Sequence, residues 1–182
     1  MKKPLMIGLG IVIVAIISII ISIGGSDSKQ GIPLQEEKPA KLRIVASFYP
    51  LYEFSKNVVG DKAEISTLIP NGVEPHDWEP NANDVLNLKE SDIFVYNGAG
   101  MEPFVDKLIN SGEYNNVKFV ETTKGIDLIQ TNDKYQKGSG DHTTYNPHVW
   151  LDPILAKHQV MIIKDAIIEA DPNNKKYYED NA

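Results

Sequence analysis

Two of the four histidines occur in matching surroundings. His76 and His148 each follow a proline, and each is followed two residues later by a tryptophan, Trp78 or Trp150. Proline preorganises the backbone before the ring, and a neutral imidazole held in this way is a good ligand for zinc and other borderline metal ions. Because the chain has no cysteine, such a site must use imidazole and carboxylate. We expect His76 and His148 to be metal ligands, the alternative being two ordinary loop histidines.

The other histidines fit ordinary roles better. His142 stands in a polar, glycine-containing stretch, where a solvated loop side chain is expected. His158 stands in a predicted helix with no second ligand four residues further on. Acidic residues near the candidate ligands are expected mainly in turns and helix caps, with orientation of an imidazole as the alternative role. These residues are Glu74, Asp77, Glu79 and Asp152.

Composition and motifs disfavour several other functions. The formal net charge of −7 argues mildly against nucleic-acid binding, which needs a basic surface. Gly98-Ala99-Gly100 lacks the rest of a phosphate-binding pattern, and no serine stands in a nucleophile-elbow sequence. Two histidines with carboxylates could form a hydrolytic metal site, but no general base is distinguished. We therefore expect a protein that is not an enzyme.

The elements that must position the two histidines alternate between strand and helix. Strands are predicted at residues 42–48, 63–69, 92–96 and 117–121, and helices at 50–59, 82–90 and 102–110. This alternation predicts an α/β fold, a four-stranded parallel sheet with flanking helices. Ligands of such sheets bind beyond the carboxyl ends of the strands, which places the loop at 70–80, with His76, on the functional edge. Residues 122–147 are predicted to be an irregular loop.

A long helix is predicted to follow His148. Asp152 can cap it, Pro153 suits its first position, and it extends to about residue 170. Its apolar residues lie on several sides, so the helix needs neighbours on several sides. Residues 171–182 predict only the first turn of another helix.

The amino-terminal segment predicts a membrane anchor. Lys2 and Lys3 precede an uncharged apolar run over residues 4–25. About 20 apolar residues are enough for a helix to cross a bilayer, and the lysines are expected to stay inside. We expect residues 1–25 to be a transmembrane signal-anchor at the cell membrane, rather than a cleaved signal peptide, with the domain on the extracytoplasmic side. Residues 26–40 predict a flexible tether.

Four segments together resemble the zinc- and manganese-specific solute-binding proteins of ABC importers, a ZnuA/TroA-like family. The resemblance begins near Lys41 and runs to the end of the chain. Any one of the segments alone would be weak, but they occur in order and at plausible spacing. They are VASFYPL at 45–51, GVEPHDWEP at 72–80, DIFVYNG at 92–98 and PHVWLDP at 147–153.

The resemblance implies a protein of two α/β lobes joined by one long helix, with the metal in the cleft between them. Residues 41–152 then correspond to the N-terminal lobe, and residues 153–182 to the interlobe helix and the start of a truncated second lobe. His76 and His148 match the two histidine ligands of the N-terminal lobe. Family members carry a third ligand and an acidic fourth in a second lobe, which these 182 residues do not include.

The function implied is capture of a divalent transition metal outside the cytoplasm and its delivery to an ABC transporter permease. Zinc is favoured over manganese as the transported ion, with weak support from the loop that contains His142. Two alternatives stay open. One is a surface adhesin or interaction module built on the same lobe, and the other, ranked below it, is a metallohydrolase.

Overall fold

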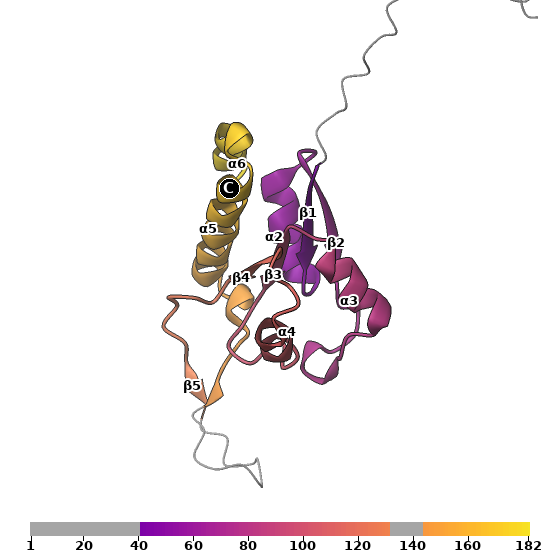
Figure 1. The fold of residues 1–182 in the computed structure, drawn as a ribbon. Coiled ribbons are helices and arrows are strands. Elements are labelled where there is room, and N and C mark those ends of the chain that lie inside the picture. Colours follow the sequence, from indigo (N-terminus) through magenta and orange to yellow (C-terminus); the bar gives the residue numbers. More distant parts are fainter. Residues whose placement is uncertain (1–40, 132–143) are drawn as a thin grey trace, which may run out of the picture. The chain divides into compact units, whose positions relative to one another are not determined.

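The computed structural model describes residues 41–131 and 144–182, and within them four parallel strands form one sheet (Figure 1). The strands are β1 (Leu42–Ala46), β2 (Ala63–Thr67), β3 (Ile93–Tyr96) and β4 (Lys118–Glu121). Their order is β2-β1-β3-β4, and every pairing is parallel. The predicted α/β fold with a four-stranded parallel sheet is confirmed.

Helices cover both faces of this sheet. From β1 the chain passes through α2 (Tyr49–Val59) to β2, and it then crosses in the other direction through α3 (Ala82–Lys89) and α4 (Val105–Ser111). Right-handed crossovers in opposite directions place their helices on opposite faces. The long helix α5 (Pro153–Ala170) packs against α2 (Figure 1).

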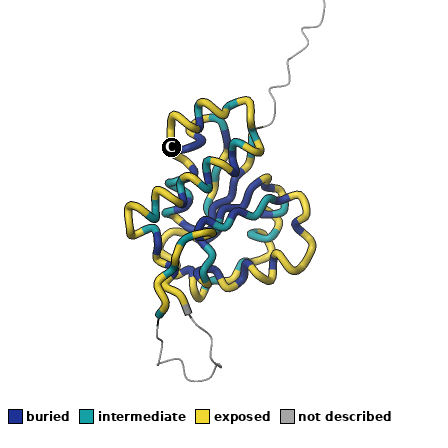
Figure 2. Tube along the Cα trace, turned by 90° about the vertical axis from the view of Figure 1, so that its left-hand side faces the viewer, coloured by how far each residue is buried: buried dark blue, intermediate teal, exposed yellow. Residues whose placement is uncertain are grey.

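The core lies on the central strands, which Figure 2 shows as the most continuously buried part of the chain. Ile93, Phe94 and Val95 of β3 have no exposed surface. Such an unbroken apolar run is typical of a parallel strand that is covered on both faces. The core is therefore a three-layer helix–sheet–helix arrangement.

Side-chain caps fix where two of the helices begin. Asn81 and Asp84 form a capping box at the start of α3. The Oδ1 atom of Asp152 accepts hydrogen bonds from the backbone N–H groups of Ile154, at 2.7 Å, and Leu155, at 3.3 Å. These bonds satisfy N–H groups that have no partner within the helix, and they confirm the predicted starts of both helices.

The last residues of the chain belong to the same core. After α5 the chain turns through η3 (Pro172–Asn174) into α6 (Lys175–Asn181). Tyr178 of α6 is fully buried and donates its hydroxyl to Asp171 at 2.6 Å. Asn181 donates its side-chain amide to the carbonyl of Val58 in α2 at 3.1 Å. The sequence predicted only the first turn of a helix here, because the partner surface on α2 is distant in sequence.

The predicted loop at residues 122–147 contains a short strand pair. β5 (Gln130–Thr131) and β6 (Thr144–Tyr145) are antiparallel. Two-residue strands carry too little pattern to be recognised in a sequence. Residues 132–143, which include His142, lie outside the described residues.

The predicted anchor at residues 1–25 and tether at 26–40 also lie outside the described residues. Over residues 41–131 and 144–182, none of the helices combines the length and apolar composition needed to span a membrane.

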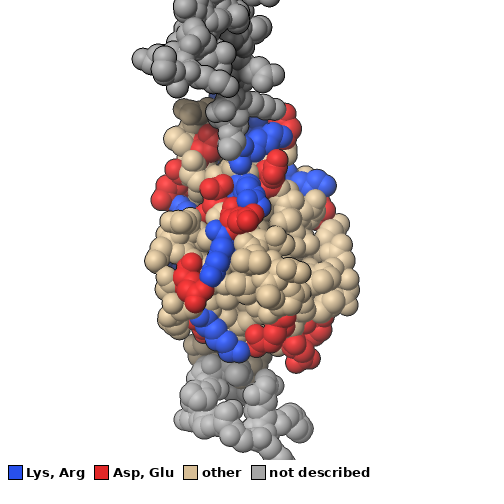
Figure 3. Space-filling view, turned by 45° about the vertical axis from the view of Figure 1, so that its right-hand side comes forward, with Lys and Arg blue, Asp and Glu red and all other residues tan. Residues whose placement is uncertain are grey.

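Charged side chains of both signs are interspersed on the surface. On the face drawn in Figure 3 they form a mixed band beside a broad uncharged region. Ion pairs between exposed groups, such as Lys107–Glu79 at 2.8 Å, contribute little stability in water. The stability of the fold therefore comes chiefly from its buried apolar residues.

Two leucines of α3 test this balance between core and surface. Leu88 is 1% exposed, whereas Leu86 is 59% exposed. We expect Leu88→Ala to lower the free energy of unfolding by about 2–5 kcal/mol, because it leaves a cavity. The matched control Leu86→Ala should change it by less than about 1 kcal/mol. Urea unfolding followed by circular dichroism measures both, and equal losses would contradict the assigned position of α3.

Candidate metal site

The structure brings His76 and His148 together from distant parts of the sequence. Their ring centroids are 5.8 Å apart, with an interplanar angle of 64°. His76 lies in the short helix η1 (Pro75–Asp77), after β2, and His148 directly precedes η2 (Val149–Leu151). Both side chains are exposed. The two predicted ligands thus lie at one edge of the sheet, where both remain exposed.

The loop that carries His76 is anchored on both sides of the ring. Pro75 is buried, and the Glu74 carboxylate accepts a hydrogen bond from the backbone N–H of His76 at 3.4 Å. Trp78 packs edge-on against the buried ring of Phe104, with centroids 5.1 Å apart. These contacts hold the backbone on either side of His76 while its imidazole stays accessible.

A neighbouring amide orients the ring of His148. The Oδ1 atom of Asn146 accepts a hydrogen bond from the backbone N–H of His148 at 3.1 Å, and it lies 2.8 Å from Nδ1 of the ring. Because this oxygen can only accept, the contact places the proton on Nδ1 and leaves the lone pair of Nε2 free. This is the tautomer that a metal-binding Nε2 requires.

Aromatic packing supports His148 from one side. The Trp150 ring lies 5.3 Å from the His148 ring and 4.8 Å from the ring of Phe48, centroid to centroid. Phe48 is buried at the start of α2. The tryptophan therefore connects the second histidine to the core.

Three of the four acidic residues named from the sequence have structural partners. Glu79 pairs with Lys107 at 2.8 Å, Asp152 caps α5, and Glu74 caps η1. His158 is exposed, and its Nε2 lies 3.2 Å from the carbonyl oxygen of Lys124. In the part of the chain that the structure describes, no three His, Cys, Asp or Glu side chains form a group that could hold a metal ion. Among the described residues, the candidate site is therefore a pair of imidazoles.

Sequence reasoning missed a buried carboxylate near this pair. Glu102 is 5% exposed and accepts hydrogen bonds from the Ser47 hydroxyl at 2.6 Å and from the backbone N–H groups of Asn97, at 2.9 Å, and Gly98, at 3.1 Å. Burial raises the pKa of the Glu102 carboxyl, while these three donors and the nearby charge of His76 oppose that rise. The sequence signal for this role is an acidic residue shortly after the Gly98-Ala99-Gly100 turn at the end of β3. From the sequence, Glu102 was predicted only to be the first residue of a helix.

Asn97 links the site to α5. Its side chain is buried, and its Nδ2 donates to the carbonyl of Pro147, the residue before His148, at 2.9 Å. Gln159 of α5 donates its Nε2 to Asn97 Oδ1 at 2.9 Å and to the Thr122 hydroxyl at 2.8 Å. The end of β3, the His148 loop and the long helix are therefore joined by one buried polar network.

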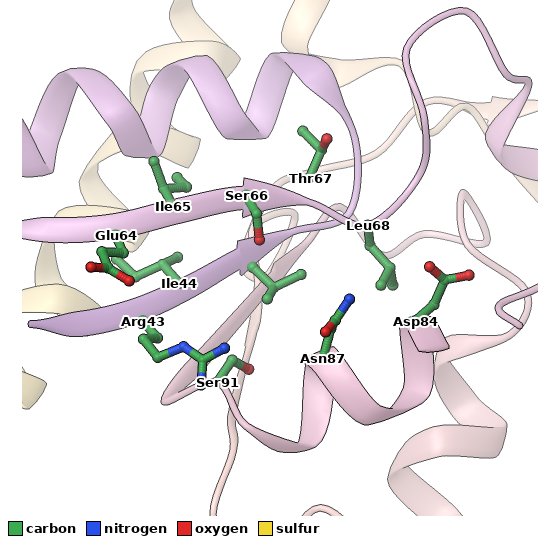
Figure 4. Close-up of a pocket in the computed structure, with 11 residues that line it drawn as sticks. Arg43, Ile44, Glu64, Ile65, Ser66, Thr67, Leu68, Asp84, Asn87 and Ser91 are labelled. Atoms are coloured by element: carbon green, nitrogen blue, oxygen red, sulfur yellow. The ribbon is translucent and has the colours of Figure 1, made fainter. Parts of the chain in front are cut away.

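A separate hollow of about 370 Å³ lies between β1, β2 and α3 (Figure 4). Neither His76 nor His148 lines it. Two of its charged groups already have partners: Arg43 pairs with Glu90 at 3.2 Å, and Asp84 accepts from the N–H of Asn81 at 2.9 Å. We therefore assign it no part in the candidate site.

Solved structures define the class of protein to which this fold belongs. AdcA from Streptococcus pneumoniae, described as Zn(II)-bound, matches with a TM-score of 0.66 and 39% identity, over 78% of this chain and 29% of that chain. FpvC from Pseudomonas aeruginosa, a solute-binding protein described in complex with Mn²⁺, matches with a TM-score of 0.69 and 34% identity, over 78% of this chain and 50% of that chain. The chain thus has the fold of one part of a solute-binding protein.

The family within this class is also defined. Residues 44–182 match the family described as zinc-uptake complex component A, periplasmic, and the chain belongs to this family, which confirms the resemblance seen in the sequence. The high-affinity zinc uptake system protein ZnuA of Bacillus subtilis (strain 168) is 39% identical over 178 residues, which cover 95% of this chain and 55% of that relative. The chain spans about half the length of the curated relatives it matches, or less.

The protonation of Glu102 gives this site a testable pH dependence. Because burial raises its pKa, the folded protein binds this proton more tightly than the unfolded chain does. The contribution of Glu102 to stability is therefore greatest below its ordinary pKa and is lost as the pH rises through the raised one. We expect the difference in unfolding free energy between the parent and Glu102→Gln to fall as the pH rises above the ordinary range of a glutamate carboxyl.

Urea unfolding at a series of pH values measures this difference. The exposed Glu64→Gln serves as a control for the change in net charge. A parent-minus-variant difference that does not vary with pH would contradict a raised pKa at Glu102.

Proposed function

We propose that His76 and His148 are two ligands of a divalent transition metal ion that the protein captures as a transported solute. The observation that carries this proposal is the 5.8 Å separation of the two exposed rings. A zinc ion bound at about 2.0–2.1 Å to one nitrogen of each ring, with a tetrahedral angle, holds the two centroids roughly 5 Å apart. The observed centroid separation is close to this value.

Zinc is the metal that this donor set favours. The chain offers imidazole nitrogen and has no thiolate, and neutral imidazole suits zinc, a borderline ion. The zinc-uptake description of the family and the Zn(II)-bound relative support the same choice. Manganese is the alternative ion, supported by the Mn²⁺-bound FpvC structure.

The proposed role is capture outside the cytoplasm and delivery to the permease of an ABC importer. The periplasmic description of the family supports this location. The apolar run after Lys2 and Lys3 supports attachment of residues 1–25 to the cell membrane. Residues 41–152 then act as one metal-binding lobe, with α5 as the helix that leads toward a second lobe. Binding and release of the ion require no bond of a substrate to be broken.

Substitution of either candidate ligand tests the site directly. His76→Ala and His148→Ala should each weaken zinc binding at least about tenfold and leave the far-ultraviolet circular dichroism unchanged, because both side chains are exposed. His158→Ala, an exposed histidine on α5, is the matched control and should bind zinc like the parent. Isothermal titration calorimetry measures the affinities. Parent-like binding by His76→Ala would remove His76 from the ligand set.

Acid should release the ion. Protons compete with a metal for imidazole nitrogen, so zinc affinity should fall as the pH is lowered. Equilibrium dialysis of the parent against zinc at pH 7.5 and at about pH 5.5 measures this loss. Equal affinity at both values would show that the ion is held by groups other than imidazole.

A further inference from the structure

The dipeptide Asn-Gly occurs twice at the edge of the sheet that carries the candidate site. Asn71-Gly72 lies in the loop after β2, and Asn97-Gly98 lies directly after β3. The side-chain amide of an asparagine can be attacked by the backbone nitrogen of the next residue, and glycine permits the close approach because it has no Cβ. The two dipeptides have the same chemistry, so their structural surroundings decide which of them reacts.

The reacting groups of Asn71-Gly72 are accessible. Both residues are exposed, and they form the tip of a turn that is closed by a hydrogen bond from the Val73 N–H to the Pro70 carbonyl at 3.1 Å. Among the described residues, neither the Asn71 side chain nor the Gly72 N–H has a hydrogen-bond partner. Gly72 has a φ of 84°, and apart from its chain neighbours no described atom lies within 4 Å of where a Cβ would stand. The Asn71 side chain is therefore free to rotate toward the Gly72 nitrogen.

The same groups of Asn97-Gly98 are held in place by hydrogen bonds. The Asn97 side chain is buried, and it donates to the Pro147 carbonyl at 2.9 Å and accepts from Gln159 at 2.9 Å. The Gly98 N–H, whose nitrogen would have to attack, donates to the Glu102 carboxylate at 3.1 Å. Reaction at this dipeptide would break these three bonds between buried groups, which costs free energy.

We propose that Asn71 is a site of spontaneous deamidation and that the fold protects Asn97 from the same reaction. The Gly72 nitrogen loses its proton to base and forms a bond to Cγ of Asn71, and the side-chain nitrogen leaves as ammonia. Water then opens the resulting five-membered succinimide ring at either of its two carbonyl groups. The products are aspartate and isoaspartate, and each carries one carboxylate where the parent has a neutral amide.

The new carboxylate would lie beside the imidazole pair. Asn71 and His148 line the same hollow of about 220 Å³, and His76 follows in the same loop as Asn71. A negative charge at this position attracts a cation, so deamidation of Asn71 should raise the affinity for a metal ion. This consequence rests on the proposed metal-binding function, whereas the deamidation itself does not.

Peptide mass spectrometry of the full 182-residue chain, incubated in a mild detergent at mildly alkaline pH, tests the proposal. In the folded protein we expect Asn71 to deamidate at least about tenfold faster than Asn97, because reaction at Asn97 requires local opening of the fold. In urea the two dipeptides should react at similar rates. An unreacted Asn71, or equal rates in the folded protein, would overturn the proposal. A difference that persists in urea would overturn protection by the fold.

Variants at two asparagines separate the modification from its effect on the metal. Asn71→Gln should block the reaction at this position, because the longer side chain would have to close a less favourable six-membered ring. By isothermal titration calorimetry, Asn71→Asp should bind zinc about two- to fivefold more tightly than Asn71→Gln. Asn110→Asp places the same charge on an exposed residue of α4 outside the hollow, and it should bind zinc like the parent. Equal affinities of Asn71→Asp and Asn110→Asp would overturn the effect on the metal and leave the deamidation standing. A parent chain that binds no zinc would overturn the proposed function, and the mass spectrometry would still decide the modification.

Discussion

The arrangement of this edge of the sheet depends on the hydrogen bonds of the Asn97 side chain. One buried amide accepts a hydrogen bond from Gln159 of α5 and donates one to the carbonyl before His148. A buried amide that loses a partner costs free energy, since no water replaces the missing bond. The position of the second histidine and the position of the long helix are therefore not independent. A displacement of either would leave Asn97 or Gln159 without its partner.

Glu102 adds an electrostatic feature beneath the same edge. It bridges Ser47, after β1, and Gly98, after β3. Between these two strands the chain connections change direction, and this is the place where open parallel sheets commonly bind ligands. The oxygens of this buried carboxyl are occupied by protein donors, and the charge of His76 opposes the rise of its pKa. Glu102 and the imidazole of His76 are therefore electrostatically coupled.

Much of the fold could be predicted from the sequence, because its signals are local. The alternation of strand-like and helix-like segments indicated the four strands, and Asn81 and Asp152 indicated where two helices begin. The position of His76 followed from a topological rule, since the loops after parallel strands lie at a common edge. The pairing with His148 was expected from the matching Pro-His-x-Trp surroundings and the family resemblance. The roles of Glu102 and Asn97 could not be predicted in this way. Ser47, Pro147 and Gln159 are among their partners and lie 50 or more residues away in sequence, so the chain near Glu102 and Asn97 shows only part of what they bind. The packing of α6 on α2 could not be predicted for the same reason, because the two helices are distant in sequence.

Helix α5 connects the two ends of this domain. The helix has 18 residues, which corresponds to a rod of about 27 Å. It starts beside the imidazole pair, and at its far end α6 contacts the last turn of α2 (Figure 1). A displacement of α6 would therefore tilt α5 as a rigid helix. Gln159, in the second turn of α5, would transmit this tilt through Asn97 to the loop that carries His148. The long helix and the loop that carries His148 are thus linked by one buried hydrogen-bonded path.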